Sequence, residues 1–294
     1  MPNQLPAPGE VYLDHVAHFV PDIEAASAAL VACGFRPTPY TAQTNREAGA
    51  TVPSGTGNRC AMLRNGYLEV LAATVDTPLS QQLRERMRHH TGLHLAAFST
   101  ADATVEHRRL REAGFVTLPL VDMRRPVTIG DTTDDARFTI ARIAHGSMPE
   151  GRTQFLTHHT ERLVWREDYL DHPNGAQALA ALWLAATDPE EPAGRFAFFT
   201  GRPARREGAV TTIALDRGAI LIATPDHLAE TLGIVPTGPP PCFVATAVRV
   251  ASLARLRGCL DRGGIAHRPV PLSGTEGIAA TLPPALGDAM IFLE

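Results

Sequence analysis

The chain has 294 residues, a formal net charge of -4 and 20% charged residues, which are ordinary values for a globular protein. This acidic balance provides no basic surface for nucleic acid or for an anionic membrane, and no apolar run is long enough to span a membrane. The N-terminus lacks a signal-peptide pattern and the four cysteines lie far apart, so we expect free thiols in a cytoplasmic protein.

The first predicted element is a strand over residues 12–20, in an apolar segment that carries two histidines. Alternation along this strand places four side chains on one face: Leu13, His15, Ala17 and Phe19. His18 then lies on the opposite face, against the helix layer, where a buried imidazole needs a hydrogen-bond partner. After Asp22, apolar residues at helical spacing predict a helix, which Gly34 can end in a left-handed conformation.

The same order of strand, aspartate, helix and glycine returns along the chain. Twelve positions separate Asp22 from Gly34, and twelve also separate Asp102 from Gly114. Weaker copies lie at residues 182–202 and 243–265. Each predicted helix is followed by short apolar segments with turn residues, which read as three strands. The sequence therefore predicts four βαβββ units that begin near residues 11, 92, 180 and 242.

One such unit cannot bury both faces of its sheet, so we expect the units to pair. The predicted fold class is α+β, with paired units forming curved sheets, helices outside and a pocket on the concave face. The polar, turn-rich segment 166–177 suggests a domain boundary. We expect a first domain at 1–170 and a second, with two degenerate units, at 171–294.

Several segments together resemble the vicinal oxygen chelate superfamily, which includes glyoxalase I, extradiol dioxygenases and bleomycin-resistance proteins. The segments are LDHVAHFVPD, GTGNRCAML, GYLEVL, FLTHHTERLVW and HPNGA. Their combination is similar to the glyoxalase-like domain proteins of bacteria. This resemblance covers about the first 180 residues, and the remainder matches only the generic unit.

The resemblance implies a divalent metal in the concave pocket, held by the first and last strands of two paired units. His15 matches the first-strand ligand and Glu69 the last-strand ligand of the first unit. When Phe98 is aligned with Phe19, His94 matches His15 in the second unit. Imidazole and carboxylate ligands suit Zn²⁺, Fe²⁺, Ni²⁺ or Mn²⁺.

The fourth ligand is left open, because superfamily enzymes usually place a carboxylate there. This chain offers either Thr157 or His158, depending on which side chain points inward. The third and fourth units have Ala181 and Ala245 at the positions of His15, so they cannot supply that ligand.

Three further residues are candidates for substrate binding. Asn58 and Arg59 follow a glycine-containing turn and can orient a carbonyl or a carboxylate, although a plain tight turn explains them equally well. Arg59 is also a possible partner for Glu69, because a buried carboxylate needs a metal, an arginine or a histidine beside it. His172 lies in a turn, either over the pocket mouth or simply between the domains.

Two functions from different classes follow. The first is a divalent-metal-dependent lyase, isomerase or dioxygenase that acts on a small oxygenated metabolite, with Glu69 and His15 as catalytic residues. The alternative is a protein that binds a small molecule in the same pocket without catalysis, as resistance proteins of the superfamily do. A third possibility is a non-catalytic protein whose units serve dimerisation, since a homodimer is compatible with paired sheets.

Overall fold

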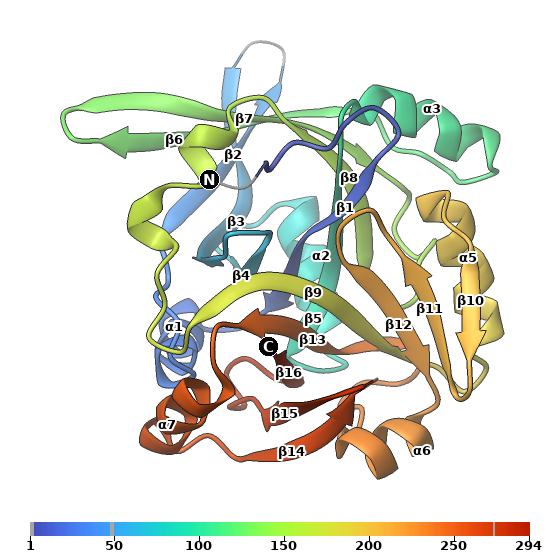
Figure 1. The fold of residues 1–294 in the computed structure, drawn as a ribbon. Helices are drawn as coiled ribbons and strands as arrows, with labels where there is room; N and C mark the ends of the chain where they lie inside the picture. The colour runs from blue at the N-terminus through green and yellow to red at the C-terminus, as the bar shows by residue number, and fades with distance from the viewer. Residues whose placement is uncertain (1–2, 48–49, 273) are drawn as a thin grey trace.

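The computed structural model describes residues 3–47, 50–272 and 274–294. Over these residues the chain forms four consecutive βαβββ units, whose first strands begin at residues 11, 92, 176 and 242 (Figure 1). The predicted repeat is therefore confirmed, with a shift of a few residues at the third unit.

The first two units supply ten strands and helices, joined by an additional helix. The first unit comprises β1 (Val11–Phe19), α1 (Ile23–Ala32), β2 (Thr41–Glu47), β3 (Ala50–Met62) and β4 (Tyr67–Ala73). After α2 (Pro78–Met87), the second unit comprises β5 (Gly92–Thr100), α3 (Ala103–Glu112), β6 (Val121–Ile129), β7 (Thr132–Arg142) and β8 (Arg152–His158). The aspartates of the repeat cap α1 and α3, because the Asp22 and Asp102 carboxylates accept hydrogen bonds from backbone N–H groups of the first turn.

The last two units follow a connection that contains α4 (Glu161–Val164) and η1 (Glu167–Tyr169). The third unit comprises β9 (Ala176–Ala185), α5 (Glu190–Thr200), β10 (Ala204–Glu207), β11 (Val210–Ala214) and β12 (Ala219–Ala223). After α6 (Pro225–His227) and η2 (Leu228–Leu232), the fourth comprises β13 (Cys242–Val250), α7 (Leu253–Gly263), β14 (His267–Leu272), β15 (Thr275–Thr281) and β16 (Ala289–Leu293).

The units pair as predicted, and each pair builds one eight-stranded sheet. The first sheet closes into a barrel in the order β1-β4-β3-β2-β6-β7-β8-β5. The second has the order β10-β11-β12-β9-β13-β16-β15-β14. In each sheet the first strands of the paired units run antiparallel, β1 beside β5 and β9 beside β13. The domain boundary near residue 170 stays a prediction.

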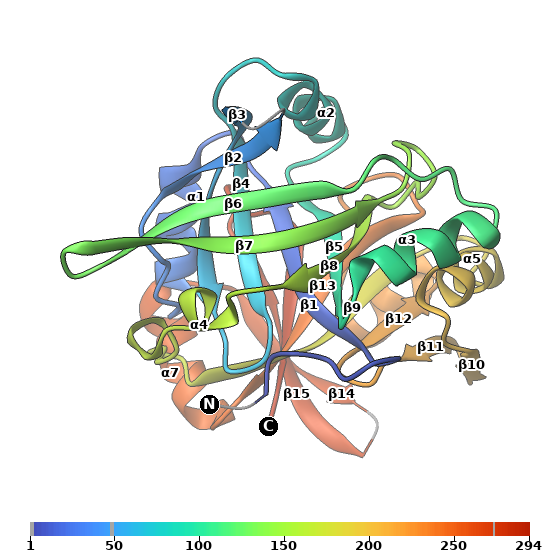
Figure 2. The same ribbon diagram turned by 90° about the horizontal axis from the view of Figure 1, so that it is seen from above.

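The two sheets pack against each other through one hydrophobic core. The outer face of the β1–β5 pair contacts the β9–β13 pair, and the core includes Leu13, Phe98, Leu182 and Phe243. Helices cover the outside, with α1 beside α7 and α3 beside α5 (Figure 2). None of the described helices has the length and apolar character needed to cross a membrane.

The concave face of the second sheet is partly covered by apolar side chains that follow β12. Leu228, Leu232 and Ile234, from η2 and the residues after it, are buried against this sheet. The barrel is different, because polar and charged side chains enter its interior from several strands. The barrel is therefore the half of the molecule whose cavity contains His15 and Glu69.

A β-bulge changes the predicted pattern of β1. Leu13 pairs with Phe98 and His15 pairs with Ala97, which leaves Asp14 as an extra residue in β1. Leu13 consequently lies in the core between the sheets, while His15 points into the barrel. The prediction that these two residues share a face was wrong, because the bulge reverses the alternation between them.

His18 lies on the outer face of the barrel, as predicted, but it packs against the second sheet and its loops and not against the helix layer. Its Nδ1 donates a hydrogen bond to the Leu286 carbonyl at 3.0 Å. Burial lowers the pKa of this imidazole to about 4, so His18 packs as a neutral side chain.

A buried carboxyl lies at the same junction. The Asp288 carboxylate accepts hydrogen bonds from the Leu93 N–H at 2.6 Å and from the Thr237 hydroxyl at 2.7 Å. Burial raises the pKa of Asp288 to about 7, above the value of an exposed aspartate. The backbone at this position has a positive φ of 60°, which asparagine also adopts readily.

Asp288→Asn is expected to stabilise the protein at neutral pH. Because the folded-state pKa lies above the unfolded value, the stabilising contribution of Asp288 is present below about pH 4 and is lost as pH rises towards 7. An uncharged amide accepts from Leu93 and donates to Thr237 without this loss. We expect a gain of roughly 1–3 kcal/mol at pH 8 and little change at pH 4 in urea unfolding. The exposed Asp168→Asn is the control, and an equal gain at both pH values would contradict the assignment.

Candidate functional site

His15 and Glu69 meet inside the barrel. They come from β1 and β4, which run parallel, with Ala17 opposite Glu69 in the register. The His15 Nε2 and Glu69 Oε2 atoms are 3.9 Å apart, and both side chains are buried. The residues that the sequence predicts from the first unit are therefore brought together in one place.

Two side-chain amides hold the Glu69 carboxylate. Its Oε1 accepts hydrogen bonds from Asn58 Nδ2 at 2.5 Å and from Gln43 Nε2 at 3.1 Å. Buried carboxylates require such donors, since an uncompensated charge in the interior is costly. Asn58 was a candidate from the sequence, but Gln43 was not, because nothing in its predicted strand distinguishes it from an exposed polar residue.

The bulged Asp14 lies between two histidines. Its Oδ1 accepts a hydrogen bond from His15 Nδ1 at 2.7 Å, and its Oδ2 accepts one from His158 Nε2 at 2.9 Å. Burial alone would raise the pKa of Asp14, but the two histidines outweigh it and hold that pKa well below its usual range. With the Nδ1 proton directed to Asp14, Nε2 is the ring nitrogen of His15 that faces Glu69 in the cavity.

His158 closes one end of the barrel. Its ring packs against Phe138 and Trp165, with centroids 5.1 and 4.8 Å away, and its Nδ1 atom has no hydrogen-bond partner among the described residues. Thr157 points outward, where its hydroxyl oxygen accepts from the Ala103 N–H at 2.7 Å. Of the two alternatives for the fourth ligand, His158 points inward, but its Nε2 is already bound to Asp14.

His94 lies in a different cavity from His15. Its ring contacts His90 at a centroid distance of 4.1 Å, and its Nε2 donates to the His90 carbonyl at 2.8 Å. Burial lowers its pKa to about 3. The residue of β5 that lines the cavity with His15 is Leu95. The predicted convergence of His94 with His15 is therefore corrected, because the alignment on Phe98 was displaced by one residue.

The strand register identifies the equivalent of Glu69 in the second unit. In the first unit Ala17 of β1 pairs with Glu69 of β4. In the second unit Ala97 of β5 pairs with Gln154 of β8. Gln154 lines the same cavity as Glu69. The second unit therefore offers an alkyl side chain and an amide where the first offers an imidazole and a carboxylate.

Two of the remaining sequence candidates point away from this cavity. Arg59 extends from the outer face of β3, where it forms an ion pair with Glu24 at 2.8 Å. His172 is buried in the connection between the halves, where Nδ1 accepts from the Arg36 N–H at 3.0 Å and Nε2 donates to the Met62 carbonyl at 2.7 Å. Arg59 is therefore not the partner of Glu69. His172 links two loops through its hydrogen bonds to Arg36 and Met62.

Three arginines that the sequence did not single out enter the barrel. Arg125, Arg142 and Arg152 line the cavity of His15 and Glu69, which we call the inner cavity and which has a volume of about 60 Å³. Apolar side chains form much of the rest of its wall: Leu71, Leu79, Leu95, Met123, Phe138, Ile140 and Leu156. A signal was available, since Arg152, Gln154 and Leu156 alternate along β8 towards the interior.

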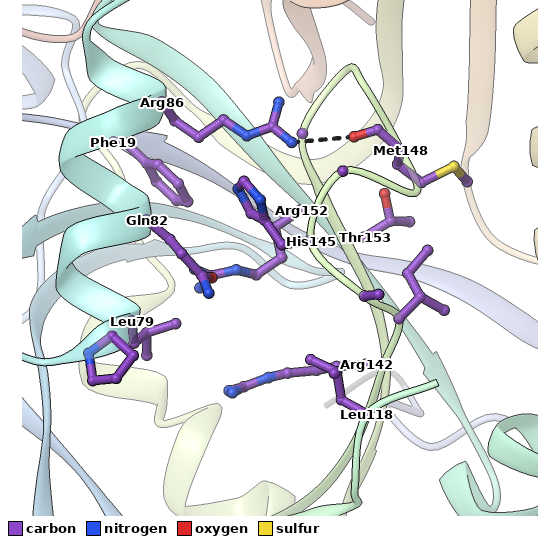
Figure 3. A pocket seen from close by; sticks show the side chains of 15 residues that line it. Phe19, Leu79, Gln82, Arg86, Leu118, Arg142, His145, Met148, Arg152 and Thr153 are labelled. Carbon is purple, nitrogen blue, oxygen red and sulfur yellow. Dashed lines mark hydrogen bonds between the residues drawn. The ribbon is translucent and has the colours of Figure 1, made fainter. Parts of the chain in front are cut away.

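A second cavity of about 220 Å³, the outer cavity, adjoins the first (Figure 3). The two share Leu79, Arg142 and Arg152 in their walls. The outer cavity lies between α2 and the ends of β7 and β8, and it is lined further by Phe19 and Met148. Arg142 and Arg152 therefore lie in the walls of both cavities.

The residues present do not fit the divalent metal that the fold suggests. His15 and Glu69 are available, but the second unit adds Leu95 and Gln154 in place of two strong ligands. Three guanidinium groups around the same space also disfavour a cation. Within the part of the chain that the structure describes, no three His, Cys, Asp or Glu side chains converge in a way that would hold a metal ion.

Comparison with known proteins places the chain among relatives of one fold. A family model described as a glyoxalase-like domain matches residues 13–199. No curated protein sequence matches the chain.

Solved structures resemble the chain over nearly its whole length. A hypothetical protein from Staphylococcus aureus has a TM-score of 0.64 at 10% identity, covering 96% of this chain and 99% of that one. A triple mutant of 4-hydroxymandelate synthase from Streptomyces coelicolor has a TM-score of 0.60 at 14% identity, covering 97% of this chain and 93% of that one. The Mn(II)-bound glyoxalase from Novosphingobium aromaticivorans has a TM-score of 0.58 at 10% identity, covering 96% of this chain and 82% of that one. At these identities the likeness concerns the fold.

Proposed function

The chain belongs to the glyoxalase-like domain family of the vicinal oxygen chelate superfamily, and on that premise we propose that its barrel binds a small oxygenated molecule without a divalent metal. The observation that carries this proposal is the pair Leu95 and Gln154 at the positions that correspond to His15 and Glu69. With two strong metal-binding side chains instead of four, the cavity still has polar groups that can orient a bound small molecule. His15 Nε2 and the Glu69 carboxylate are those groups.

A proton-transfer activity is the second candidate, and it rests on Asp14. The hydrogen bond of 2.7 Å between Asp14 Oδ1 and His15 Nδ1 orients the imidazole and leaves Nε2 as an acceptor beside the cavity. This arrangement suits removal of a proton from a bound molecule. The assignment of His15 and Glu69 as catalytic residues stays a prediction.

Tryptophan fluorescence provides a test of ligand binding. The chain has two tryptophans, Trp165 and Trp183. Trp165 packs edge-on against Tyr67, which lines the inner cavity, at a centroid distance of 5.9 Å. In a Trp183→Phe variant, Trp165 is the only tryptophan and reports on that cavity.

We expect small hydroxy and oxo compounds, neutral or acidic, to change the Trp165 emission saturably. The ligand concentration at the midpoint of this fluorescence titration should be the same in the presence of a chelator and in the presence of added Mn²⁺. His15→Gln should shift the midpoint, whereas His159→Gln, at an exposed histidine after β8, serves as the matched control. A response that requires the metal would contradict metal-free binding.

A further inference from the structure

Arg142 and Arg152 stand at the junction of the inner and outer cavities without a partner. Neither guanidinium forms an ion pair or a hydrogen bond with any residue that the structure describes, and the Arg142 Nε atom is buried without an acceptor. Figure 3 shows the Arg142 side chain extending from its strand across the outer cavity towards α2. Each guanidinium therefore faces the space between the cavities without a protein hydrogen-bond acceptor, and Glu69 of the inner cavity is the carboxylate whose charge acts on Arg152.

Other arginines near the outer cavity are satisfied by the protein itself. Arg86 donates to the carbonyls of Pro149 at 2.6 Å and Met148 at 3.3 Å. Arg195 forms a bidentate pair with Glu150 at 2.7 Å for each bond. Arg142 and Arg152 differ from these two arginines in that no protein acceptor binds their guanidinium groups.

Burial makes these two charges costly in the empty cavity. Burial lowers the pKa of Arg142, and burial together with the neighbouring arginines lowers the pKa of Arg152 to about 9. Like charges placed side by side and half-buried favour the binding of an anion between them. A carboxylate satisfies a guanidinium fork by paired hydrogen bonds.

The outer cavity adds an apolar wall to this anion position. Phe19, Leu79, Ile143 and Met148 line it, and Arg152 Cζ lies 5.5 Å from the centroid of the Phe19 ring. Its volume of about 220 Å³ is below the usual range for drug-sized ligands, which limits the occupant to a small metabolite. An apolar chain of several carbons fits these walls better than a second charged group does.

We infer that the ligand is an amphipathic organic acid, whose carboxylate binds Arg142 and Arg152 while its apolar tail occupies the outer cavity. The inference rests on the proposed function, since the same molecule directs its other polar atoms to His15 and Glu69. Neither the family nor the fold specifies this ligand class. It follows from two unpaired arginines between a polar and an apolar cavity.

Calorimetric titration of the full chain with three probes tests the inference. Hexanoate carries both features, hexanamide keeps the tail without the charge, and acetate keeps the charge without the tail. We expect hexanoate to bind at least roughly tenfold more tightly than either of the others, because a charge-assisted bidentate contact contributes about that much. Equal affinity for hexanoate and hexanamide would overturn the inference, and this comparison needs no variant.

Variants locate the binding site. Arg142→Gln and Arg152→Gln should each weaken hexanoate binding about tenfold or more, while Arg84→Gln, on the outer side of α2 and paired with Asp76, should leave it unchanged. Unchanged affinity in both cavity variants would also overturn the inference. If neutral oxygenated compounds still change Trp165 emission in that case, the proposed function stands and only the ligand class is wrong. If no compound does so, both are wrong.

Discussion

Replacing Asp14 with alanine is expected to lower the free energy of unfolding by about 3–5 kcal/mol, the cost of breaking a buried charge network by removing one member. The Asp14 carboxylate is fully buried and accepts from His15 and His158 at 2.7 and 2.9 Å. Its removal leaves two buried imidazole N–H groups without an acceptor. Urea unfolding followed by circular dichroism measures the change.

The pH dependence separates this electrostatic role from loss of packing. Because the folded-state pKa of Asp14 lies well below the unfolded value, its stabilisation is fully present above about pH 4 and is lost as pH falls further. The difference in free energy of unfolding between wild type and Asp14→Ala should therefore be constant above that pH and become smaller below it. Asp134→Ala, at a surface ion pair with Arg162, is the control and should cost less than about 1 kcal/mol. A pH-independent loss at Asp14 would contradict the network.

The second large effect is expected at Trp165, which closes the barrel beside His158. Its side chain is fully buried, and its Nε1–H donates to the Leu63 carbonyl at 3.1 Å. Trp165→Ala should destabilise the protein by about 3–5 kcal/mol through the cavity that it leaves. Because Tyr67 packs on Trp165 and stacks on His15 at 4.3 Å, the variant should also weaken ligand binding.

Trp165→Phe is the matched variant. It keeps an aromatic ring in contact with His158 and Tyr67 but removes the hydrogen bond to Leu63, so we expect a smaller loss of roughly 1–2 kcal/mol. Both variants are compared by thermal and urea unfolding. An alanine variant as stable as the phenylalanine variant would mean that the ring does not close the barrel.

Much of the fold was predictable because it depends on local signals. The repeated spacing from Asp22 to Gly34 and from Asp102 to Gly114 is set by a capped helix and its end, which the structure confirms at α1 and α3. The pairing of the units followed from the need to bury both faces of a sheet. The apolar cover on the second sheet was not predictable, since it depends on where η2 packs after folding.

Only the residues that the first βαβββ unit contributes to the candidate site were predictable. His15 and Glu69 were found because both lie in strongly patterned strands of one unit. His94 was misplaced by one residue, although alignment on the capping residues Asp22 and Asp102 leads directly to Leu95. Phenylalanines in strands are interchangeable in alignment, whereas a helix cap has a fixed position relative to the preceding strand.

Long-range contacts account for the other differences. The carboxylate of the bulged Asp14 bonds to His158, which is 144 residues away, so its surroundings cannot be inferred from β1 alone. Arg142 and Arg152 are informative only once β7 and β8 are known to close a barrel around Glu69. The alternation along β8 places Arg152 on the same face as Gln154 and Leu156, but nothing within that segment indicates that this face lines a cavity.

The central claim is that the barrel lacks the ligand set for a divalent metal. Calorimetric titration of chelator-treated wild type and His15→Ala with Mn²⁺ and Zn²⁺ tests it most directly. We predict that the two proteins titrate alike, with no stoichiometric site that depends on His15. A stoichiometric site in the wild type that disappears in His15→Ala would contradict the claim.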